Sequence, residues 1–369
     1  MTVLDKRGVN EMSTLKSLGV NGRFLAQSTT GVQRYALNVA RSIGAVSSQA
    51  GGAVSIIAPP STKNPDIEGL KFEVLGKNSG HIWEQFDLPH YYRGPLLNFC
   101  NTAPAVKSNQ IVCIHDANVF LAPESYSLRF RAFYKIIQPI LARRATKITT
   151  VSKFSARQIS AALSVKECDI AVLPNGYEHV LSWNSALSDK ARSAIDSNSD
   201  LRSKHFILVL GSRAKHKNIQ LAIDLSAELS KLNLNLIIAG GQSKIFKEEY
   251  MKGADNIFNL GYVTDHDLAY LFERALCLVF PSMTEGFGLP VLEAMALGCP
   301  VISTDRASLP ELCGDAALLA SPVRPLEWIK HLQDIVASAS LREDLIGRGR
   351  ERAALFSWNK TALGYMSLL

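Results

Sequence analysis

The sequence predicts an α/β protein made of two consecutive doubly wound parallel sheets, and three observations lead to this. The chain has 369 residues, more than one ordinary hydrophobic core accommodates. Short apolar runs alternate with amphipathic stretches, which is typical of parallel strands joined by crossover helices. A polar segment over residues 182–204, rich in Ser, Asp and Asn, divides this series into two halves.

The first half contains strand-like runs bounded by turn residues, and between them longer amphipathic stretches. The expected strands are residues 19–25, 54–58, 72–75, 96–99, 111–114, 147–151 and 170–173. The expected helices are residues 32–46, 127–145 and 153–163, the last of them capped by Ser152 or Thr150.

The second half repeats the alternation, beginning with an apolar run at residues 206–210. Further strands are expected at residues 235–239, 257–260, 276–280, 300–303 and 316–319. Helices are expected at residues 218–232, 243–251, 265–275, 289–296, 325–339, 341–355 and 358–369. We therefore expect a polar extension over residues 1–16, Rossmann-like domains over 17–185 and 186–356, and a final helix over 357–369 that crosses back to the first domain.

Composition narrows the class of protein further. An apolar fraction of 47% and a charged fraction of 20% describe a globular protein. The first residues contain no long apolar segment, so we expect no signal peptide. The 6 cysteines form no Cys-x-x-Cys pair and have no His at zinc spacing. These features favour the reducing cytoplasm.

The positive charge is concentrated in the first half. Residues 1–177 contain 20 Lys and Arg against 11 Asp and Glu, whereas the whole chain has a net charge of +7. Such an excess suits an anionic membrane surface or a phosphate-bearing acceptor, although basic residues also simply keep a surface solvated. Nucleic acid is not expected, because the basic residues are scattered and match no reader motif.

The loop after the strand at residues 276–280 has the features of a binding site, because ligands of doubly wound sheets lie at the carboxyl ends of strands. It contains two glycines and leads into a helix with Pro290 in its first turn. The N–H groups of Phe287, Gly288 and Leu289 would then form an anion site. Glu285 and Glu293 flank this turn, and the alternative is that they only favour the helix start electrostatically.

Other strand-to-helix loops also contain residues suited to a ligand. Arg213 and Lys217 follow the first strand of the second half, where they bind a diphosphate or form an exposed basic turn. Gly31 opens the first helix outside any Gly-x-Gly-x-x-Gly pattern, so a nicotinamide dinucleotide is not expected. His115 ends an apolar strand, where a structural role is the alternative, and Asp116 is expected to shape the loop.

Asp265-His-Asp267 has the form of the Asp-x-Asp pair that metal-dependent glycosyl-transferring enzymes use. Here it follows Thr264 and begins a helix, in the order of a capping box. Capping explains both carboxylates, and we expect no metal.

The chain resembles the large retaining glycosyltransferase family 4, whose fold is called GT-B. The resemblance lies in Glu285-x7-Glu293 and in a series of further motifs in family order, from about residue 20 to residue 358. These motifs include Gly31-Val-Gln-Arg-Tyr35, Ile114-His-Asp116, Leu173-Pro-Asn-Gly176, Lys215-His-Lys-Asn218, Leu260-Gly-Tyr-Val263 and Leu309-Pro-Glu-Leu-Cys-Gly-Asp315. Each motif alone is only moderately specific, whereas the ordered set is highly specific.

The resemblance implies two domains facing across a cleft, with the domain over residues 17–185 on the acceptor side and the domain over residues 186–356 binding the donor. It also implies a nucleoside-diphosphate sugar as that donor, and no metal or other cofactor. Glu285 would bind the sugar and Glu293 the ribose, while Lys217 and Arg213 would stabilise the leaving diphosphate. His216 occupies a position often held by Arg in the family, so the choice between Arg213 and His216 stays open. Gly31 would let the backbone approach the donor phosphate, and His115 would lie beside the donor sugar. The backbone of Tyr262 and Val263 would contact the base.

The segments Val20-Asn-Gly-Arg-Phe24 and Gly31-Val-Gln-Arg-Tyr35 are similar to those of bacterial surface-polysaccharide mannosyltransferases, which favours GDP-mannose over UDP-glucose or dTDP-rhamnose. The implied acceptor is a saccharide or a polyprenyl-diphosphate-linked sugar, and the implied location is the cytoplasm, with peripheral contact to the inner face of the membrane. Two alternatives stay open: a nucleotide-sugar epimerase or hydrolase on the same fold, and a non-catalytic sugar-nucleotide-binding scaffold.

Overall fold

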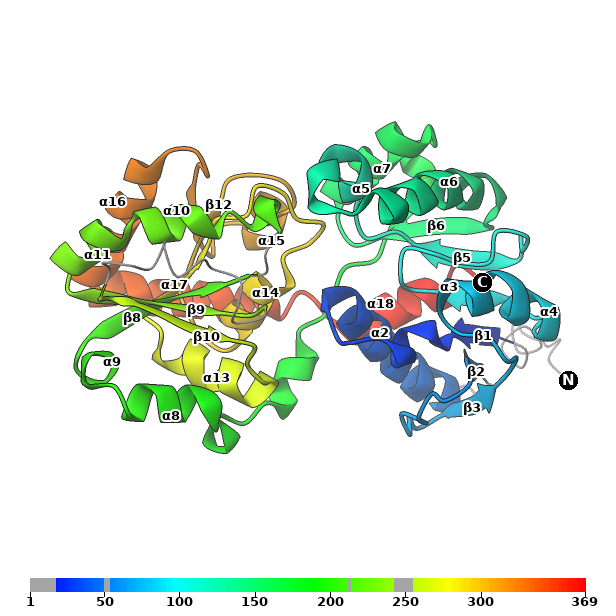
Figure 1. Cartoon of the computed structure of the whole chain (residues 1–369), viewed down its shortest axis with the longest axis horizontal. Helices are drawn as coiled ribbons and strands as arrows, with labels where there is room; N and C mark the ends of the chain where they lie inside the picture. The colour runs from blue at the N-terminus through cyan, green and yellow to red at the C-terminus, as the bar shows by residue number, and fades with distance from the viewer. Residues whose placement is uncertain (1–17, 50–53, 212–213, 242–254) are drawn as a thin grey trace, which may run out of the picture. The chain divides into compact units, whose positions relative to one another are not determined.

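Two α/β units make up the chain, in a computed structural model that describes residues 18–49, 54–211, 214–241 and 255–369. One unit combines the chain up to Gly176 with Ser357–Leu369, and the other is Tyr177–Phe356 (Figure 1). The boundary therefore falls at Tyr177 and not at the expected residue 186. The expected extension over residues 1–16 and the expected helix over residues 243–251 lie outside the described residues.

The N-terminal unit contains a 7-stranded parallel sheet in the order β3-β2-β1-β4-β5-β6-β7. Its strands are β1 (Leu18–Asn21), β2 (Val54–Ala58), β3 (Leu70–Val74), β4 (Leu96–Asn98), β5 (Gln110–Cys113), β6 (Lys147–Thr150) and β7 (Ile170–Val172). Each falls where the alternation predicts a strand. The order reverses direction between β1 and β4, and this is the topological switch point where doubly wound sheets bind ligands.

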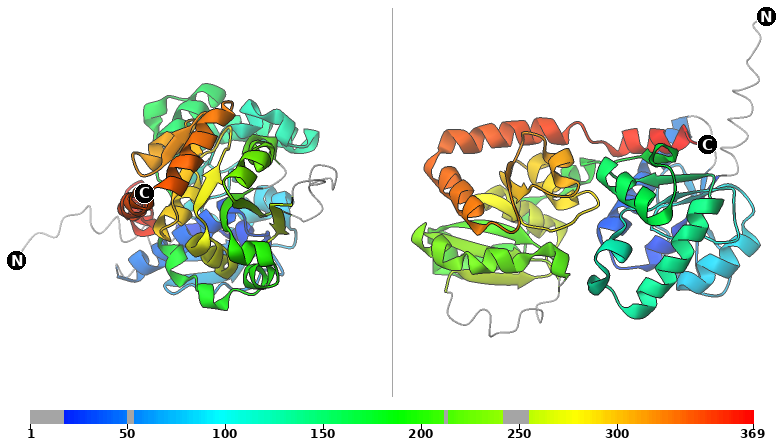
Figure 2. Two further views of the ribbon diagram at one scale, coloured as in Figure 1. Left: turned by 90° about the vertical axis from the view of Figure 1, so that its left-hand side faces the viewer. Right: turned by 90° about the horizontal axis from the view of Figure 1, so that it is seen from above.

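Helices cover both faces of this sheet (Figures 1 and 2). On one face α6 (Leu128–Arg144) and α7 (Lys153–Leu163) pack on β5 and β6 through a buried aliphatic core. On the other face α2 (Gly31–Gln49) lies beside α18 (Trp358–Met366), the last helix of the chain. Ser152 caps α7 by accepting a hydrogen bond from the N–H of Ser155, as predicted.

The first strand is shorter than predicted, because the side chain of Asn21 accepts a hydrogen bond from the N–H of Arg23 and starts the 3-10 helix η1 (Gly22–Ala26). Several short helices were not predicted. They are α3 (Gly80–Ile82), the π-helix η2 (Trp83–Asp87), α4 (Leu88–Tyr91), α5 (Asn118–Leu121), η3 (Pro123–Ser125) and η4 (Glu167–Asp169). The first three follow one another without a gap, and the π-helix among them breaks the 3.6-residue period, whereas the other three are too short to show a period.

The C-terminal unit contains a 6-stranded parallel sheet in the order β10-β9-β8-β11-β12-β13. Its strands are β8 (His205–Leu210), β9 (Leu234–Ala239), β10 (Ile257–Gly261), β11 (Cys277–Phe280), β12 (Val301–Thr304) and β13 (Leu318–Ala320). The switch point lies between β8 and β11.

Helices cover this sheet as well. One core joins the sheet to α10 (Ile219–Asp224), α11 (Ser226–Lys231), α16 (Pro325–Ala337) and α17 (Ala339–Ala353). The remaining elements are η5 (Glu178–Ser182), η6 (Ser185–Leu187), α8 (Lys190–Asp196), α9 (Ser199–Ser203), η7 (Lys215–Lys217), α13 (Asp265–Arg274), α14 (Leu289–Ala296) and α15 (Leu309–Cys313). The helix expected over residues 218–232 is divided at Leu225.

The polar segment over residues 182–204, expected to divide the two halves, is part of this unit because it packs on α13. Asp267 of α13 accepts hydrogen bonds from the Ser188 hydroxyl and from the N–H groups of Asp189 and Ala191. Among the helices of the described ranges, none has both the length and the apolar composition that crossing a bilayer requires.

Candidate functional site

Lys217 and Glu285 meet at the switch point of the C-terminal unit. Lys217 ends η7, which follows β8, and Glu285 lies in the loop that follows β11. The Lys217 Nζ lies 2.7 Å from the Glu285 Oε1, and the two side chains are 22% and 12% exposed. Nζ also lies 5.7 Å from the centre of the Phe280 ring. The pair is thus partly screened from water yet open to a ligand.

Asn218 fixes the position of this pair. Its backbone adopts a left-handed conformation with φ of 51°, which Asn tolerates better than most residues. Its side-chain amide donates to the carbonyl oxygens of Pro281 and Pro322, 3.2 Å away in each case. The N–H of Met283 donates to the carbonyl of His216 at 2.6 Å. The loops after β8, β11 and β13 are therefore tied together at one residue.

The first turn of α14 lies in the same loop. Gly288 occupies the N-cap position with φ of 104° and, as a glycine, makes no side-chain cap to this helix. A Cβ at Gly288 would come within 2.4 Å of the Leu309 side chain, so backbone angle and packing both require glycine. The Ser308 hydroxyl lies 3.0 Å from the Glu285 carbonyl and 2.9 Å from that of Phe287. Since the first N–H groups of a helix lack intrahelical partners, this turn suits an anion.

Glu293 lies one turn further along α14, and its carboxylate is held by a residue that the sequence did not single out. The His179 Nε2 lies 2.9 Å from the Glu293 Oε1, and both side chains are 5% exposed. The His179 ring packs edge-on against Trp183 at 5.5 Å. The sequence gives no signal for His179, because the residue with which it pairs lies 114 residues away and not at a recognisable spacing.

Tyr262 and Val263 follow β10. The Tyr262 carbonyl accepts a hydrogen bond from the Lys190 Nζ at 2.6 Å, its side chain is 71% exposed, and Val263 is buried. Thr264 and Asp267 form the predicted capping box at the start of α13. Burial would raise the pKa of Asp267, but hydrogen bonds from the Ala191 and Thr264 N–H groups and from the Thr264 and Ser188 hydroxyls lower it to about 2.

Of the predicted diphosphate-binding residues, Arg213 lies outside the described residues. His216 belongs to η7, next to Lys217, and its carbonyl accepts the bond from Met283 described above. The choice between Arg213 and His216 as the second phosphate contact stays a prediction.

Gly31 and His115 belong to the N-terminal unit. Gly31 is the first residue of α2, and a Cβ added there would meet nothing within 4 Å. No neighbour within its unit therefore requires a glycine at this position. Asp116 accepts a hydrogen bond from the N–H of Asn118, which confirms its predicted loop-shaping role.

His115 follows β5, and its imidazole is buried. Its Nε2 lies 2.7 Å from the Phe99 carbonyl, so Nε2 carries a proton, because a carbonyl only accepts. Burial lowers the pKa of His115, but the adjacent Cys113 thiol and the Phe99 carbonyl outweigh it, and the pKa is raised. The N–H of His115 also donates to the Asn101 Oδ1 at 2.7 Å.

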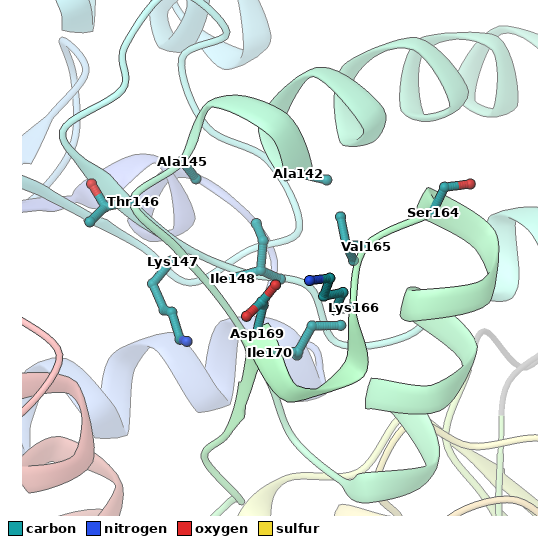
Figure 3. Close-up of a pocket in the computed structure, with 10 residues that line it drawn as sticks. All are labelled: Ala142, Ala145, Thr146, Lys147, Ile148, Ser164, Val165, Lys166, Asp169 and Ile170. Carbon is teal, nitrogen blue, oxygen red and sulfur yellow. The ribbon is translucent and has the colours of Figure 1, made fainter.

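A pocket of about 450 Å³ lies at the opposite, amino-terminal ends of β6 and β7 (Figure 3). Lys147, Lys166 and Asp169 supply its charged groups. It contains none of the predicted site residues, and doubly wound sheets bind their ligands at the other edge.

The two doubly wound units and the loops at the switch point of the second define a GT-B glycosyltransferase. The family described as "Glycosyl transferases group 1" matches residues 192–352. O-antigen chain mannosyltransferase B of Escherichia coli is 31% identical over 293 residues, which cover 75% of this chain and 73% of the relative. O-antigen chain mannosyltransferase RfbU of Salmonella typhimurium is 26% identical over 256 residues, covering 67% of each chain. The chain belongs to the group 1 glycosyl transferases.

Solved structures show the same fold. A sucrose-phosphate synthase from Thermosynechococcus elongatus superposes with a TM-score of 0.68 at 19% identity, covering 95% of this chain and 97% of the other. The Anabaena protein HepE in complex with UDP and glucose gives a TM-score of 0.68 at 15% identity, covering 96% and 100%. The predicted family and fold class are confirmed.

Proposed function

We propose that the protein is a retaining mannosyltransferase that uses GDP-mannose. The acceptor is a saccharide or a polyprenyl-diphosphate-linked sugar in cell-surface polysaccharide synthesis. The observation that carries the proposal is the contact of 2.7 Å between Lys217 and Glu285, at the switch point and beside the start of α14. Two relatives whose names describe O-antigen mannosyltransferases support mannose as the sugar.

The chemistry of the pair suits a diphosphate sugar. An ammonium group has three N–H donors, so Lys217 can bind Glu285 and a phosphate oxygen together. Glu285 has a second oxygen that can accept from a sugar hydroxyl. Lys217, with Arg213, then stabilises the negative charge that grows on the diphosphate as the glycosidic bond breaks. The N–H groups of Phe287, Gly288 and Leu289 add a further anion contact.

The C-terminal unit also supplies the remaining donor contacts. Glu293, oriented by His179, accepts from the ribose hydroxyls, and the backbone of Tyr262 and Val263 contacts the base. In the transfer, the acceptor hydroxyl oxygen bonds to the anomeric carbon on the face from which the diphosphate leaves. The electrons of the broken bond and the acceptor proton both go to the leaving phosphate. The protein contributes by positioning the donor and the acceptor and by stabilising the negative charge on the leaving diphosphate.

No metal or other cofactor has a part in this proposal. The Asp-x-Asp pair at residues 265–267 supports this, because Asp267 accepts from Thr264, Ser188 and Ala191 and serves the start of α13. Lys217 and Arg213 supply the positive charge in place of a divalent ion. Gly31 and His115 retain their predicted roles toward the donor phosphate and the donor sugar.

The experiment is a thermal-shift screen of the full chain against GDP-mannose, UDP-glucose and dTDP-rhamnose, followed by product analysis with and without mannobiose. Stabilisation by GDP-mannose and an α-linked trisaccharide product are expected. Conversion of the donor without an acceptor at the same rate would indicate an epimerase or hydrolase. Donor binding without any product would indicate a binding scaffold.

We also propose that the protein acts in the cytoplasm with peripheral contact to an anionic membrane, and α6 supports this. The helix contains five basic and no acidic residues. Leu128 and Ile136 are 78% and 65% exposed, and Arg129 and Lys135 are exposed beside them. Apolar and basic side chains on one exposed face suit an anionic lipid surface.

Co-sedimentation with vesicles tests this contact. Vesicles containing phosphatidylglycerol should bind the wild-type chain at low salt, and neutral phosphatidylcholine vesicles should not. Replacing both Arg129 and Lys135 with Gln should reduce binding about 30-fold, since each basic residue near such a surface contributes about 1 kcal/mol and 1.4 kcal/mol is a factor of ten. Equal sedimentation with both kinds of vesicle would contradict the proposal.

A further inference from the structure

A serine that the sequence did not single out supports the loop between β11 and α14. Ser308 lies directly before α15 and is 1% exposed. Its hydroxyl group donates to the Glu285 carbonyl at 3.0 Å and to the Phe287 carbonyl at 2.9 Å. A hydroxyl has one proton to donate, so this is a three-centre hydrogen bond. One buried side chain therefore binds two carbonyl groups of the proposed donor loop.

Ser308 occupies the N-cap position of α15, yet its side chain does not cap that helix. Serine is favoured at this position because its hydroxyl oxygen usually accepts from an N–H of the first turn. Ser152 and Ser338 do so at the starts of α7 and α17, with extended backbones. Ser308 instead has helical angles, with φ of −80° and ψ of −9°. Its hydroxyl group thus serves the neighbouring loop and not the stability of its own helix.

The residue before Ser308 has an unfavourable backbone conformation. Ala307 has φ of 59°, in the left-handed region, where the Cβ of an alanine crowds the backbone. Such a conformation persists only where the surrounding structure holds it, and it is most frequent at functional sites. Ala307 departs from the usual backbone preference and Ser308 from the usual capping preference. Departures of this kind are typical of residues that serve a site.

The short helix α15 is held at both ends, which gives Ser308 a fixed position. At its start the Leu309 side chain packs against Gly288, where a Cβ would come within 2.4 Å of it. At its end the Arg352 guanidinium donates to two carbonyl oxygens of α15, at 2.8 Å and 2.6 Å. Since Arg352 belongs to α17, the donor loop is connected through α15 to a long helix of the same unit.

The bond from Ser308 also determines which way an amide group of the loop faces. In a planar trans peptide, the C=O and the N–H of one peptide unit point in opposite directions. The Phe287 carbonyl points toward Ser308, so the N–H of the same peptide unit, which belongs to Gly288, points away from it. Because Ser308 is buried, this N–H points away from the buried side of the loop.

We propose that Ser308 is a positioning residue for the transfer, which fixes Glu285 for the donor sugar and the Gly288 N–H for the leaving phosphate. The proposal rests on the proposed function, since it concerns the donor of the same reaction. Ser308 touches no substrate and acts only through the loop. Donors that are already in place when charge grows on the diphosphate need no reorganisation at that moment, so the support of the loop affects the rate.

Ser308→Ala tests this role because it removes only the hydroxyl group. With GDP-mannose as donor and mannobiose as acceptor, kcat should fall about tenfold, since a small displacement of the groups around a reacting bond is costly. The acceptor KM should not change. Ser308→Thr keeps a hydroxyl group and should recover most of the loss.

Ser338→Ala is the matched control, because Ser338 also precedes a helix of this unit but caps its own helix. S338A should lower the unfolding temperature at least as much as S308A does, and it should retain the wild-type kcat. A wild-type kcat in S308A would overturn the proposal, and so would an equal loss of kcat in S308A and S338A.

Amide hydrogen exchange of the full chain, without donor, separates this proposal from the proposed function. Exchange over residues 285–289 should become several-fold faster in S308A and stay unchanged in S338A, because only Ser308 holds this loop. If the wild type forms no product from any donor, the proposed function fails. Unchanged exchange of the loop in S308A would instead refute the support by Ser308.

Discussion

Single residues provide the sharpest test of the donor site, beginning with Lys217. Lys217→Ala removes the charge proposed to stabilise the leaving diphosphate, and kcat should fall about 100- to 1000-fold. The side chain is partly exposed, so the unfolding temperature should change little. Lys215→Ala is the matched control, because Lys215 lies exposed in the same short helix. Steady-state kinetics with GDP-mannose measures both variants, and K217A with wild-type turnover would exclude the assigned role.

His179 is predicted to act through Glu293 as a positioning residue. His179→Ala removes the partner of a buried carboxylate, so the donor KM should rise about tenfold while the acceptor KM is unchanged. His179→Gln, which can still donate a hydrogen bond to Glu293, should recover part of the loss. A fall in kcat with no change in the donor KM would contradict a role in ribose binding.

Residues that act within one strand-loop-helix segment could be predicted from the sequence, and residues that join distant segments could not. Glu285, Gly288 and Glu293 lie in one recognisable segment. Asn218 belongs to a motif in the sequence, but its role there depends on a partner 63 residues away, and His179, whose partner lies 114 residues away, belongs to no motif. The contact between Lys217 and Glu285 was likewise not foreseen, although both residues were.

At the scale of elements, a substitution in the first turn of α2 should change donor binding without lowering the stability of the protein. Gly31→Ala should not reduce the free energy of unfolding, because no atom lies within 4 Å of the added Cβ and Ala favours a helix by up to about 1 kcal/mol. The donor KM should nevertheless rise if the donor phosphate approaches this backbone. Gly347→Ala in α17, where an added Cβ also meets nothing, is the control that should retain activity. Chemical denaturation measures the free energy of unfolding of both variants, and steady-state kinetics measures their donor KM. A wild-type donor KM in G31A would show that Gly31 is not part of the site.

The positions of the long helices and strands followed from periodicity, whereas their ends depended on single side chains. Asn21 ends β1 early by capping a 3-10 helix. Over residues 80–91, α3, η2 and α4 follow one another without a gap, and the π-helix η2 interrupts the 3.6-residue period by which a sequence reveals a helix. Residues 182–204 have the composition of a linker but fold because Asp267 binds them through Ser188 and the Ala191 N–H.

At the scale of the whole molecule, α18 completes the N-terminal unit. Tyr365 is fully buried, and its hydroxyl lies 3.0 Å from that of Tyr35 and 2.9 Å from that of Thr149. Tyr365→Ala should destabilise this unit by about 3–5 kcal/mol, as other large buried aromatic truncations do. Leu363→Ala, at a half-exposed position of the same helix, should cost far less.

Thermal unfolding with and without GDP gives the measurement. Tyr365→Ala should lower the unfolding temperature of the N-terminal unit, and GDP should still stabilise the unit that contains Lys217 and Glu285. An equal loss in Y365A and L363A would contradict this role of α18.

The return of the last helix to the first unit also sets an order for synthesis on the ribosome. Tyr177–Phe356 is one continuous stretch of chain, and it can fold as soon as Phe356 has emerged. The earlier unit, although translated first, lacks Trp358 and Tyr365 until residues 357–369 leave the exit tunnel. Until then the face of α2 that contains Tyr35 is not covered by α18. We therefore expect the later unit to reach its native state before the earlier one.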